Sequence, residues 1–381
     1  MLAILLGLIS KMRPFPSLKK NQRLFLIGWT LLIASLSAAA IAMCYRQQSL
    51  NLKAATSRND ARMASDAAGD GTTEAERTPP AGHEKDVPDP VEVGVYIDRV
   101  YDLSLVGSVW KADFYAWFTW TNPKLNPGET FQVVNGEILS RTLMKKKNIG
   151  RRHYALYRVM AQVTKTFDTT RFPRDDHMLT LSLEDTVSQS YQLVYTADPS
   201  SDISSRVKVP GYAVSQKSIA IKPHSYKTSR GDLELPTAYK ATYSQFIYGI
   251  TIARPSWGMY FKMFQVLYAS VLIALLALFL KANDSSRLGG LIVGSFFAAV
   301  ANSYIISTLI PDPGVMTLAD VINGIGTSLI GLVTIESVIS LHIFENQRDH
   351  AFSRAFDLVN FFLLAAIYIA INIITPLAAS L

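Results

Sequence analysis

The chain has 381 residues, of which 49% are hydrophobic and 18% charged, and its net charge is +7. This share of apolar residues is unusual for a purely soluble protein and indicates a membrane protein. The single cysteine, Cys44, excludes an intrachain disulfide and any zinc site built from cysteines. The basic residues gather in local clusters, and the first cluster is typical of a topology signal, so no nucleic-acid partner is predicted.

The N-terminal region divides into three segments. Residues 1–23 are basic, and residues 24–45 form an apolar run long enough to cross a bilayer. By the positive-inside rule the basic segment is predicted to be cytoplasmic and the following chain to be exported. The apolar run is either an uncleaved anchor or a signal peptide cut near the alanines at 38–40. Residues 46–90 have few large apolar side chains, so we predict a disordered tether.

The next block, residues 91–254, alternates apolar and polar side chains with the period of two that strands require. Stretches 91–105 and 109–120 are predicted to form two long strands, and the glycine-containing turn between them predicts a hairpin. Helical periodicity is almost absent here. The block is therefore predicted to fold as one antiparallel β-sandwich.

The last block, residues 255–381, contains four apolar stretches of about 20 residues or more, each sufficient for a helix to cross a membrane. The predicted fold class is thus a β + α membrane protein: an exported antiparallel β-sandwich, then a four-helix transmembrane bundle, plus an N-terminal anchor or signal helix. The short basic turns at 281–287 and 345–354 are predicted to be cytoplasmic.

Catalytic motifs are missing from the sequence. It contains no short motif of a serine hydrolase, a zinc protease, a phosphate-binding loop or a dinucleotide-binding fold. We therefore predict no enzymatic activity, no catalytic residue, no metal centre and no cofactor. One acidic segment leaves alternatives open: Asp175, Asp176 and His177 either bind a divalent cation or respond to pH, or they lie in a solvated loop.

The stretch FDTTRFPRD resembles the signature loop of the pentameric ligand-gated ion channels, the Cys-loop receptor superfamily. In that family the loop carries Phe-Pro-x-Asp, which matches Phe172, Pro173 and Asp175 here. Two cysteines flank the family's loop, and Lys165 and Leu179 stand in their places. The chain is therefore similar to the cysteine-free bacterial branch of the superfamily.

Other features fall in the order that this family would place them. Trp120 fits a tryptophan that is nearly universal in the family, and the resemblance covers residues 91–376. It implies a homopentamer in a lipid bilayer, in which a small molecule, a proton or an ion binds between neighbouring β-domains and opens a pore lined by residues 288–310. It also implies a multi-pass protein of the bacterial inner membrane, with the β-domain in the periplasm.

The family's pore-facing positions correspond to Gly290, Gly294, Phe297, Ala301, Tyr304 and Thr308. Phe297 is then expected to form a hydrophobic constriction that gates by dewetting. The more polar residues Ser295, Asn302 and Ser307 fall largely off that stripe, so either they line water or they form hydrogen bonds between helices. The apolar stripe keeps a second function open, a pentameric sensor or scaffold that passes no ions.

The resemblance also implies two further sets of residues. The ligand-binding set is Tyr115, Thr186, Tyr191, Tyr226 and Tyr243, and the set that couples binding to the pore is Phe172, Pro173, Asp175, Arg254 and Pro311. Thr186 stands where animal receptors carry a tryptophan that stacks on quaternary ammonium, so an acetylcholine-like ligand is not expected.

Three charged residues, one at the end of the β block and two in the apolar block, carry alternatives. Arg254 is expected to be buried beside a carboxylate such as Asp175, or else to anchor a helix at the membrane interface. Arg287 either favours anions at the inner mouth of the pore or faces lipid headgroups. Glu336, deep in the third helix, is either a proton sensor or a structural partner for a neighbouring helix.

Overall fold

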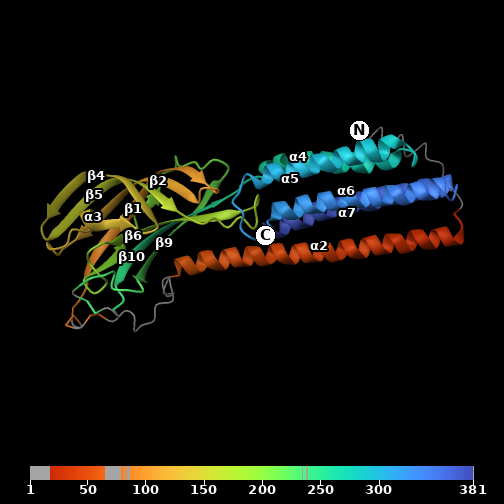
Figure 1. The fold of residues 1–381 in the computed structure, drawn as a ribbon. Helices are drawn as coiled ribbons and strands as arrows, with labels where there is room; N and C mark the ends of the chain where they lie inside the picture. Colours follow the sequence, from red (N-terminus) through yellow and green to blue (C-terminus); the bar gives the residue numbers. More distant parts are fainter. Residues whose placement is uncertain are drawn as a thin grey trace. The chain divides into compact units, whose positions relative to one another are not determined.

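The computed structural model describes residues 18–64, 79–80, 82–83, 86–233, 235–236 and 239–380 (Figure 1). The basic segment predicted to be cytoplasmic lies mostly outside these residues. The chain forms two compact units. The helical unit comprises Met1–Leu52 as far as it is described, Thr169–Arg174 and Ser256–Leu381, and the β unit comprises Lys53–Asp168 and Asp175–Pro255.

The β unit contains two sheets. In the six-stranded sheet the order is β4 (Gly136–Ile149), β5 (Arg152–Thr164), β2 (Val109–Trp120), β1 (Asp89–Ser104) and β7 (Leu193–Ala197), and β8 (Asp202–Ile203) also pairs with β1. In the four-stranded sheet it is β3 (Phe131–Val133), β6 (Asp176–Asp185), β10 (Thr242–Ala253) and β9 (Ala213–Ser225). A short helix, α3 (Pro127–Thr130), precedes β3.

The predicted hairpin of the first two strands is confirmed, since β1 and β2 pair antiparallel on either side of the turn. The expectation of a wholly antiparallel arrangement is wrong at one edge, because β1 pairs in parallel with β7 and with β8. Both are short strands that reach β1 after a crossover, and a crossover connection brings strands together in parallel.

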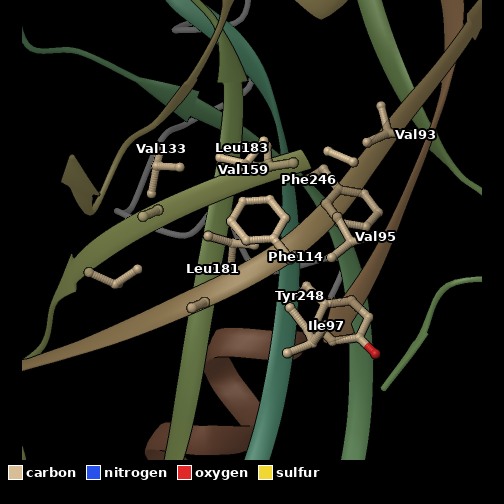
Figure 2. Close-up of a cluster of buried hydrophobic side chains, with 14 of the residues drawn as sticks. Val93, Val95, Ile97, Phe114, Val133, Val159, Leu181, Leu183, Phe246 and Tyr248 are labelled. Carbon is tan, nitrogen blue, oxygen red and sulfur yellow. The ribbon is translucent and has the colours of Figure 1, made fainter. Parts of the chain in front are cut away.

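The core of the β unit is built from the inward-facing residues of both sheets. Figure 2 shows Phe114 and Val95 from one sheet near Leu181, Phe246 and Tyr248 from the other. All five are 0% exposed. Alternate residues of each strand contribute, as the period-two pattern predicts, and this core fixes the register of every strand that carries a functional side chain.

Within the part of the helical unit that the structure describes, five helices are long and apolar enough to cross a membrane. They are the first part of α2 (Lys20–Met63), α4 (Gly258–Leu276), α5 (Val293–Ser307), α6 (Leu318–Glu345) and α7 (His350–Ala378). A 3-10 turn, η2 (Ala277–Phe279), extends α4, and a π-helical segment, η3 (Ser286–Ile292), leads into α5. The predicted pore helix is thus helical from residue 286 to residue 307, and Thr308 follows as its C-cap.

Helix α2 corrects one prediction. It continues to Met63, so residues 46–63, predicted to begin a disordered tether, are helical. The reason is local: this part is rich in alanine, leucine, arginine and other good helix formers, and neither glycine nor proline interrupts the helix after Gly28. Residues 65–78 of the predicted tether lie outside the described part of the chain.

The first turns of α2 pack against α6 and α7. Leu26 is buried in a cluster with Ile343, Phe352 and Phe356. The indole Nε1 of Trp29 donates a hydrogen bond of 3.0 Å to Asn360 Oδ1. Helix α2 thus continues unbroken past residues 38–40, and its first turns contact two other helices of this unit.

Candidate functional site

A buried polar cluster lies where β6 begins and β10 ends in the β unit. Arg254 Nε donates to Asp175 Oδ1 at 2.6 Å, and Arg254 Nη2 donates to Tyr212 OH at 2.7 Å. Tyr212 OH donates in turn to Asp175 Oδ2 at 3.1 Å, and His177 Nε2 lies 2.6 Å from the same oxygen. The Arg254 guanidinium also stacks on the Tyr212 ring, 4.2 Å from its centroid. We call these four residues the junction cluster.

Burial decides between the sequence-based alternatives here. The side chains of Asp175 and Arg254 are 1% and 6% exposed, so Arg254 is a buried ion-pair partner rather than an interfacial anchor. The solvated-loop reading is wrong for Asp175 and His177, because both are buried. Among the described residues, no three His, Cys, Asp or Glu side chains are grouped as a metal ion would require.

Electrostatics keeps Asp175 ionised. Burial alone would raise the pKa of its carboxyl group, because a charge is poorly solvated in the protein interior. The hydrogen bond with His177 and the charges of His177 and Arg254 outweigh burial, so the pKa of Asp175 lies well below its usual range. The same burial, together with the Asp175 charge, raises the pKa of Tyr212 and keeps its hydroxyl protonated as a donor.

The position of the junction cluster in the chain is informative. Asp175 is the first residue of the β unit after the segment Thr169–Arg174, which belongs to the helical unit. Arg254 is followed by Pro255, the last residue of the β unit, and the helical unit resumes at Ser256. The ion pair therefore ties together two of the places at which the chain passes from one unit to the other.

The segment Thr169–Arg174 contains the Phe-Pro part of the signature loop and is built into the helical unit. Thr170 O accepts a hydrogen bond from Leu318 N at 2.9 Å, and Phe172 O accepts one from Ala319 N at 3.1 Å. These amides lie in the first turn of α6, where the helix itself supplies no acceptor. These two hydrogen bonds of the loop thus reach the start of α6, and neither involves Pro311, another coupling residue that the resemblance implies.

The segment Thr169–Arg174 also contacts the end of α7 and the residue just before α4. Arg171 Nη1 donates at 3.0 Å to Ala379 O, the C-cap of α7, where a cation stabilises the helix dipole. The Arg174 guanidinium stacks on Trp257 just before α4, 4.3 Å from the ring centroid. Phe172 and Pro173 are themselves buried. A displacement of this loop would therefore act on α4, α6 and α7 together.

A second cluster, the tyrosine cluster, lies on the outward face of the four-stranded sheet. Tyr226 OH donates to Glu184 Oε1 at 2.9 Å, and His224 Nδ1 lies 2.7 Å from Glu184 Oε2. The rings of Tyr226 and Tyr243 meet edge to face at 5.7 Å between centroids. Burial and the Glu184 charge raise the pKa of Tyr226, so its hydroxyl remains a donor to the carboxylate.

A cation from the chain itself occupies this cluster. The guanidinium of Arg230 lies 4.6 Å from the Tyr226 ring centroid and 5.5 Å from that of Tyr243. Arg230 is exposed and has a φ of 59°, in the left-handed region that a non-glycine residue seldom adopts. The two rings therefore form a surface on which a planar cation stacks.

The other predicted ligand residues do not join this cluster. Tyr115 lies on the six-stranded sheet, where the Arg158 guanidinium is 5.8 Å from its ring centroid. Thr186 is exposed, and its Oγ1 donates to Thr130 O at 2.8 Å. Tyr191 packs on His83, with 4.9 Å between ring centroids. Of the predicted ligand set, Tyr226 and Tyr243 are thus brought into ring contact within one chain.

The predicted pore-lining residues share one uncovered face of the helix formed by η3 and α5. Gly290, Gly294, Ala301 and Thr308 are exposed within the chain, and Phe297 and Tyr304 are 67% and 71% exposed. The polar residue Asn302 points the other way and is buried, with its Nδ2 donating to Asn323 Oδ1 of α6 at 3.0 Å. Asn302 therefore forms a hydrogen bond between helices, which was one of the two alternatives for the polar residues outside the predicted pore-facing stripe.

Both alternatives predicted for Arg287 are wrong, since its side chain neither lines the pore mouth nor faces lipid headgroups. It is 0% exposed, and it donates to both carboxylate oxygens of Asp357 in α7, at 2.9 and 2.7 Å. Its Nε donates to Ser337 Oγ of α6 at 3.0 Å. Glu336 is buried next to Ser337 in the same helix. Arg287 thus joins three helices of the unit, through a buried bidentate pair with α7 and a single hydrogen bond to α6.

Comparison with protein-family models gave no match, and no curated protein matches the chain. The features of the chain that bear on its function are the junction cluster, the tyrosine cluster and the uncovered face of α5.

Proposed function

We propose that the chain is the subunit of a homopentameric ligand-gated ion channel with an N-terminal transmembrane anchor. In this proposal the β unit is a periplasmic β-sandwich that binds the ligand, and the helical unit forms the pore in the bacterial inner membrane. The observation that carries the proposal is the buried pair of Asp175 and Arg254, which lies next to two of the chain's crossings between the units.

The junction cluster supplies a mechanical path from ligand to pore. Movement of β6 or β10 displaces Asp175 or Arg254, because a buried ion pair cannot separate without a cost of several kcal/mol. Residues adjacent to Asp175 hold the first turn of α6 through the carbonyls of Thr170 and Phe172. Helix α6 in turn contacts α5 through the buried bond between Asn302 and Asn323. A strand movement is thereby passed to the helix proposed to line the pore.

The uncovered face of α5 supports assembly around an axis. It presents Phe297 and Tyr304 among glycines, and none of the described residues of the same chain covers these two rings. In a ring of five chains this face surrounds the axis. Phe297, roughly halfway along the helix, then forms the narrow apolar ring that controls wetting of the pore.

The tyrosine cluster is the proposed principal face of the ligand site. Glu184 is fully buried and the rings of Tyr226 and Tyr243 already hold a guanidinium, so the site favours a ligand with a positively charged group. Tyr115, on the other sheet, is proposed to belong to the complementary face of a neighbouring chain. A ligand entering this site has to displace Arg230 from the two rings.

The decisive experiment is electrical recording from purified full-length protein in a planar bilayer, tested across pH and small amines. We expect ligand-dependent currents in the wild type. Phe297→Ser is expected to raise current in the absence of ligand, because a hydroxyl ring at the constriction is wetted more easily. The matched control is Phe362→Ser, which changes an exposed phenylalanine on α7 and is expected to leave gating unchanged.

The second candidate function is a pentameric sensor or scaffold of the same fold that passes no ions. It is favoured by the predicted pore stripe itself, which carries no charged side chain and is mostly apolar. The same recordings separate the two functions. Ligand-induced stabilisation of a pentamer without current, in both the wild type and Phe297→Ser, would assign the sensor.

A further inference from the structure

The β unit contains a pocket that the channel proposal does not use, although it shares one lining residue, His224, with the tyrosine cluster. It has a volume of about 470 Å³ and lies between the last turns of α2 and the outward face of the four-stranded sheet. Helix α2 contributes Arg58 and Arg62, and the strands contribute Ser182, Lys222 and Gln245. This volume lies in the range of roughly 300–1,000 Å³ that small-molecule sites occupy, and it is far larger than a single halide ion needs.

Strand register explains why polar groups gather in the pocket. Gln245 of β10 pairs with Lys222 of β9, and Ile247 pairs with Ser182 of β6. Directly opposed residues of antiparallel strands point to the same face, and here that face is opposite to the one that forms the core. A sheet face of this kind normally meets water. In this protein the end of α2 covers it and leaves a lined hollow.

The charges in the pocket are unbalanced. None of the described residues that line it is acidic. Arg58 and Arg62 lie one helical turn apart, which places two like charges side by side. Arg58 pairs with Asp168, but among the described residues Arg62 forms no ion pair with an acidic side chain. Positive charge therefore exceeds negative charge on the α2 side of the pocket.

Lys222 adds a third cation, this one held in place. Lys222 is only 2% exposed, and its Nζ donates a hydrogen bond of 2.8 Å to Ala61 O in the last turn of α2. An ammonium group has three donors, so further donors remain for a ligand. Near Arg62, burial above all and then the Arg62 charge lower the pKa of Lys165 to about 8. Burial is the larger cause of this shift, and the Arg62 charge adds to it against the opposing charge of Asp168.

We propose that this pocket binds a small organic anion through a carboxylate or phosphate group. The guanidinium of Arg62 is planar and suits two oxygens of such a group, and Lys222 supplies a point charge on the sheet side. Ser182 and Gln245 add neutral hydrogen-bonding groups. Such a ligand bridges α2 to the sheet, so its binding stabilises the docking of the last turns of α2. The site lies within one β unit and is independent of the proposed channel function.

The test is isothermal titration of purified full-length protein with citrate and with inorganic phosphate, each at constant ionic strength. We expect saturable binding of at least one of the two, and citrate without phosphate would indicate carboxylate recognition. Arg62→Gln is expected to weaken binding by roughly tenfold or more, as loss of a hydrogen bond between charged groups does. Arg46→Gln is the matched control, because Arg46 is an exposed arginine of the same helix outside the pocket.

A second variant distinguishes loss of binding from loss of folding. Gln245→Glu keeps nearly the same shape and adds a negative charge to the lining, so it is expected to abolish anion binding in a protein that elutes normally from a sizing column. The proposal is overturned if neither anion binds, or if Arg62→Gln and Arg46→Gln change the affinity equally. Because binding and not current is measured, this outcome is distinguishable from failure of the channel proposal.

Discussion

At the residue scale, the carboxylate of Asp175 is the group on which the junction cluster depends. It accepts hydrogen bonds from Arg254 and Tyr212 and contacts His177, and it is almost fully buried. We expect Asp175→Asn to lower the free energy of unfolding by about 3–5 kcal/mol, because Arg254 is left buried without a counter-charge. Denaturant titration of the detergent-solubilised protein measures this loss.

The control for that variant is Asp60→Asn, which changes the same residue type at an exposed position of α2. We expect it to alter stability by no more than about 0.5 kcal/mol, as surface substitutions generally do. Equal losses in the two variants would show that the buried ion pair does not stabilise the fold.

Asp175 also predicts a pH dependence. Its pKa is lower in the folded protein than in the unfolded chain, so its contribution to stability is complete above the unfolded pKa of about 3.9 and is lost as the pH falls through the folded pKa. We expect the melting temperature of the wild type to fall steeply below about pH 4, and that of Asp175→Asn to fall less. Parallel curves would contradict the assignment.

Partners of single residues were predictable only in part. The pairing of Arg254 with Asp175 was expected from the family resemblance and from the cost of a buried charge, beside the alternative of an interfacial anchor. Glu184 stands at a polar position of an alternating strand, where solvent exposure is the ordinary expectation, yet it is fully buried. Asp357 was missed as the partner of Arg287 because seventy residues separate them and no local pattern links their helices.

At the scale of elements, α2 is the unexpected one. Its apolar length predicts a membrane span, but only the structure places Trp29 and Leu26 against α6 and α7. We expect Trp29→Ala to lower stability by about 2 kcal/mol, since half-buried ring contacts and a hydrogen bond are lost. Trp29→Phe keeps the ring and is expected to cost about 1 kcal/mol.

Thermal unfolding in detergent, followed by intrinsic fluorescence or aggregation, ranks these variants. Leu32→Ala serves as the control, because Leu32 is 51% exposed on the same helix. If Leu32→Ala destabilises as much as Trp29→Ala, then α2 is held by its general hydrophobicity and not by the contacts with α7.

At the scale of the whole molecule, the proposal requires five copies of the 42.1 kDa chain. Native mass spectrometry of the solubilised protein is expected to show a pentamer whose subunit mass still includes residues 20–63. A monomer, or a subunit that begins after residue 40, would contradict the pentamer or the anchor respectively. The first result would leave the uncovered face of α5 without the neighbours that the channel requires.

The sequence by itself determined the kinds of element and their order. A period of two specifies strands and long apolar runs specify membrane-crossing helices, because each pattern depends only on near neighbours. Only the tertiary structure decided which side chains meet: Tyr212 joins the junction cluster, Asp357 neutralises Arg287, and the end of α2 covers a sheet face. These contacts join distant segments through packing in three dimensions, and no spacing along the chain encodes them.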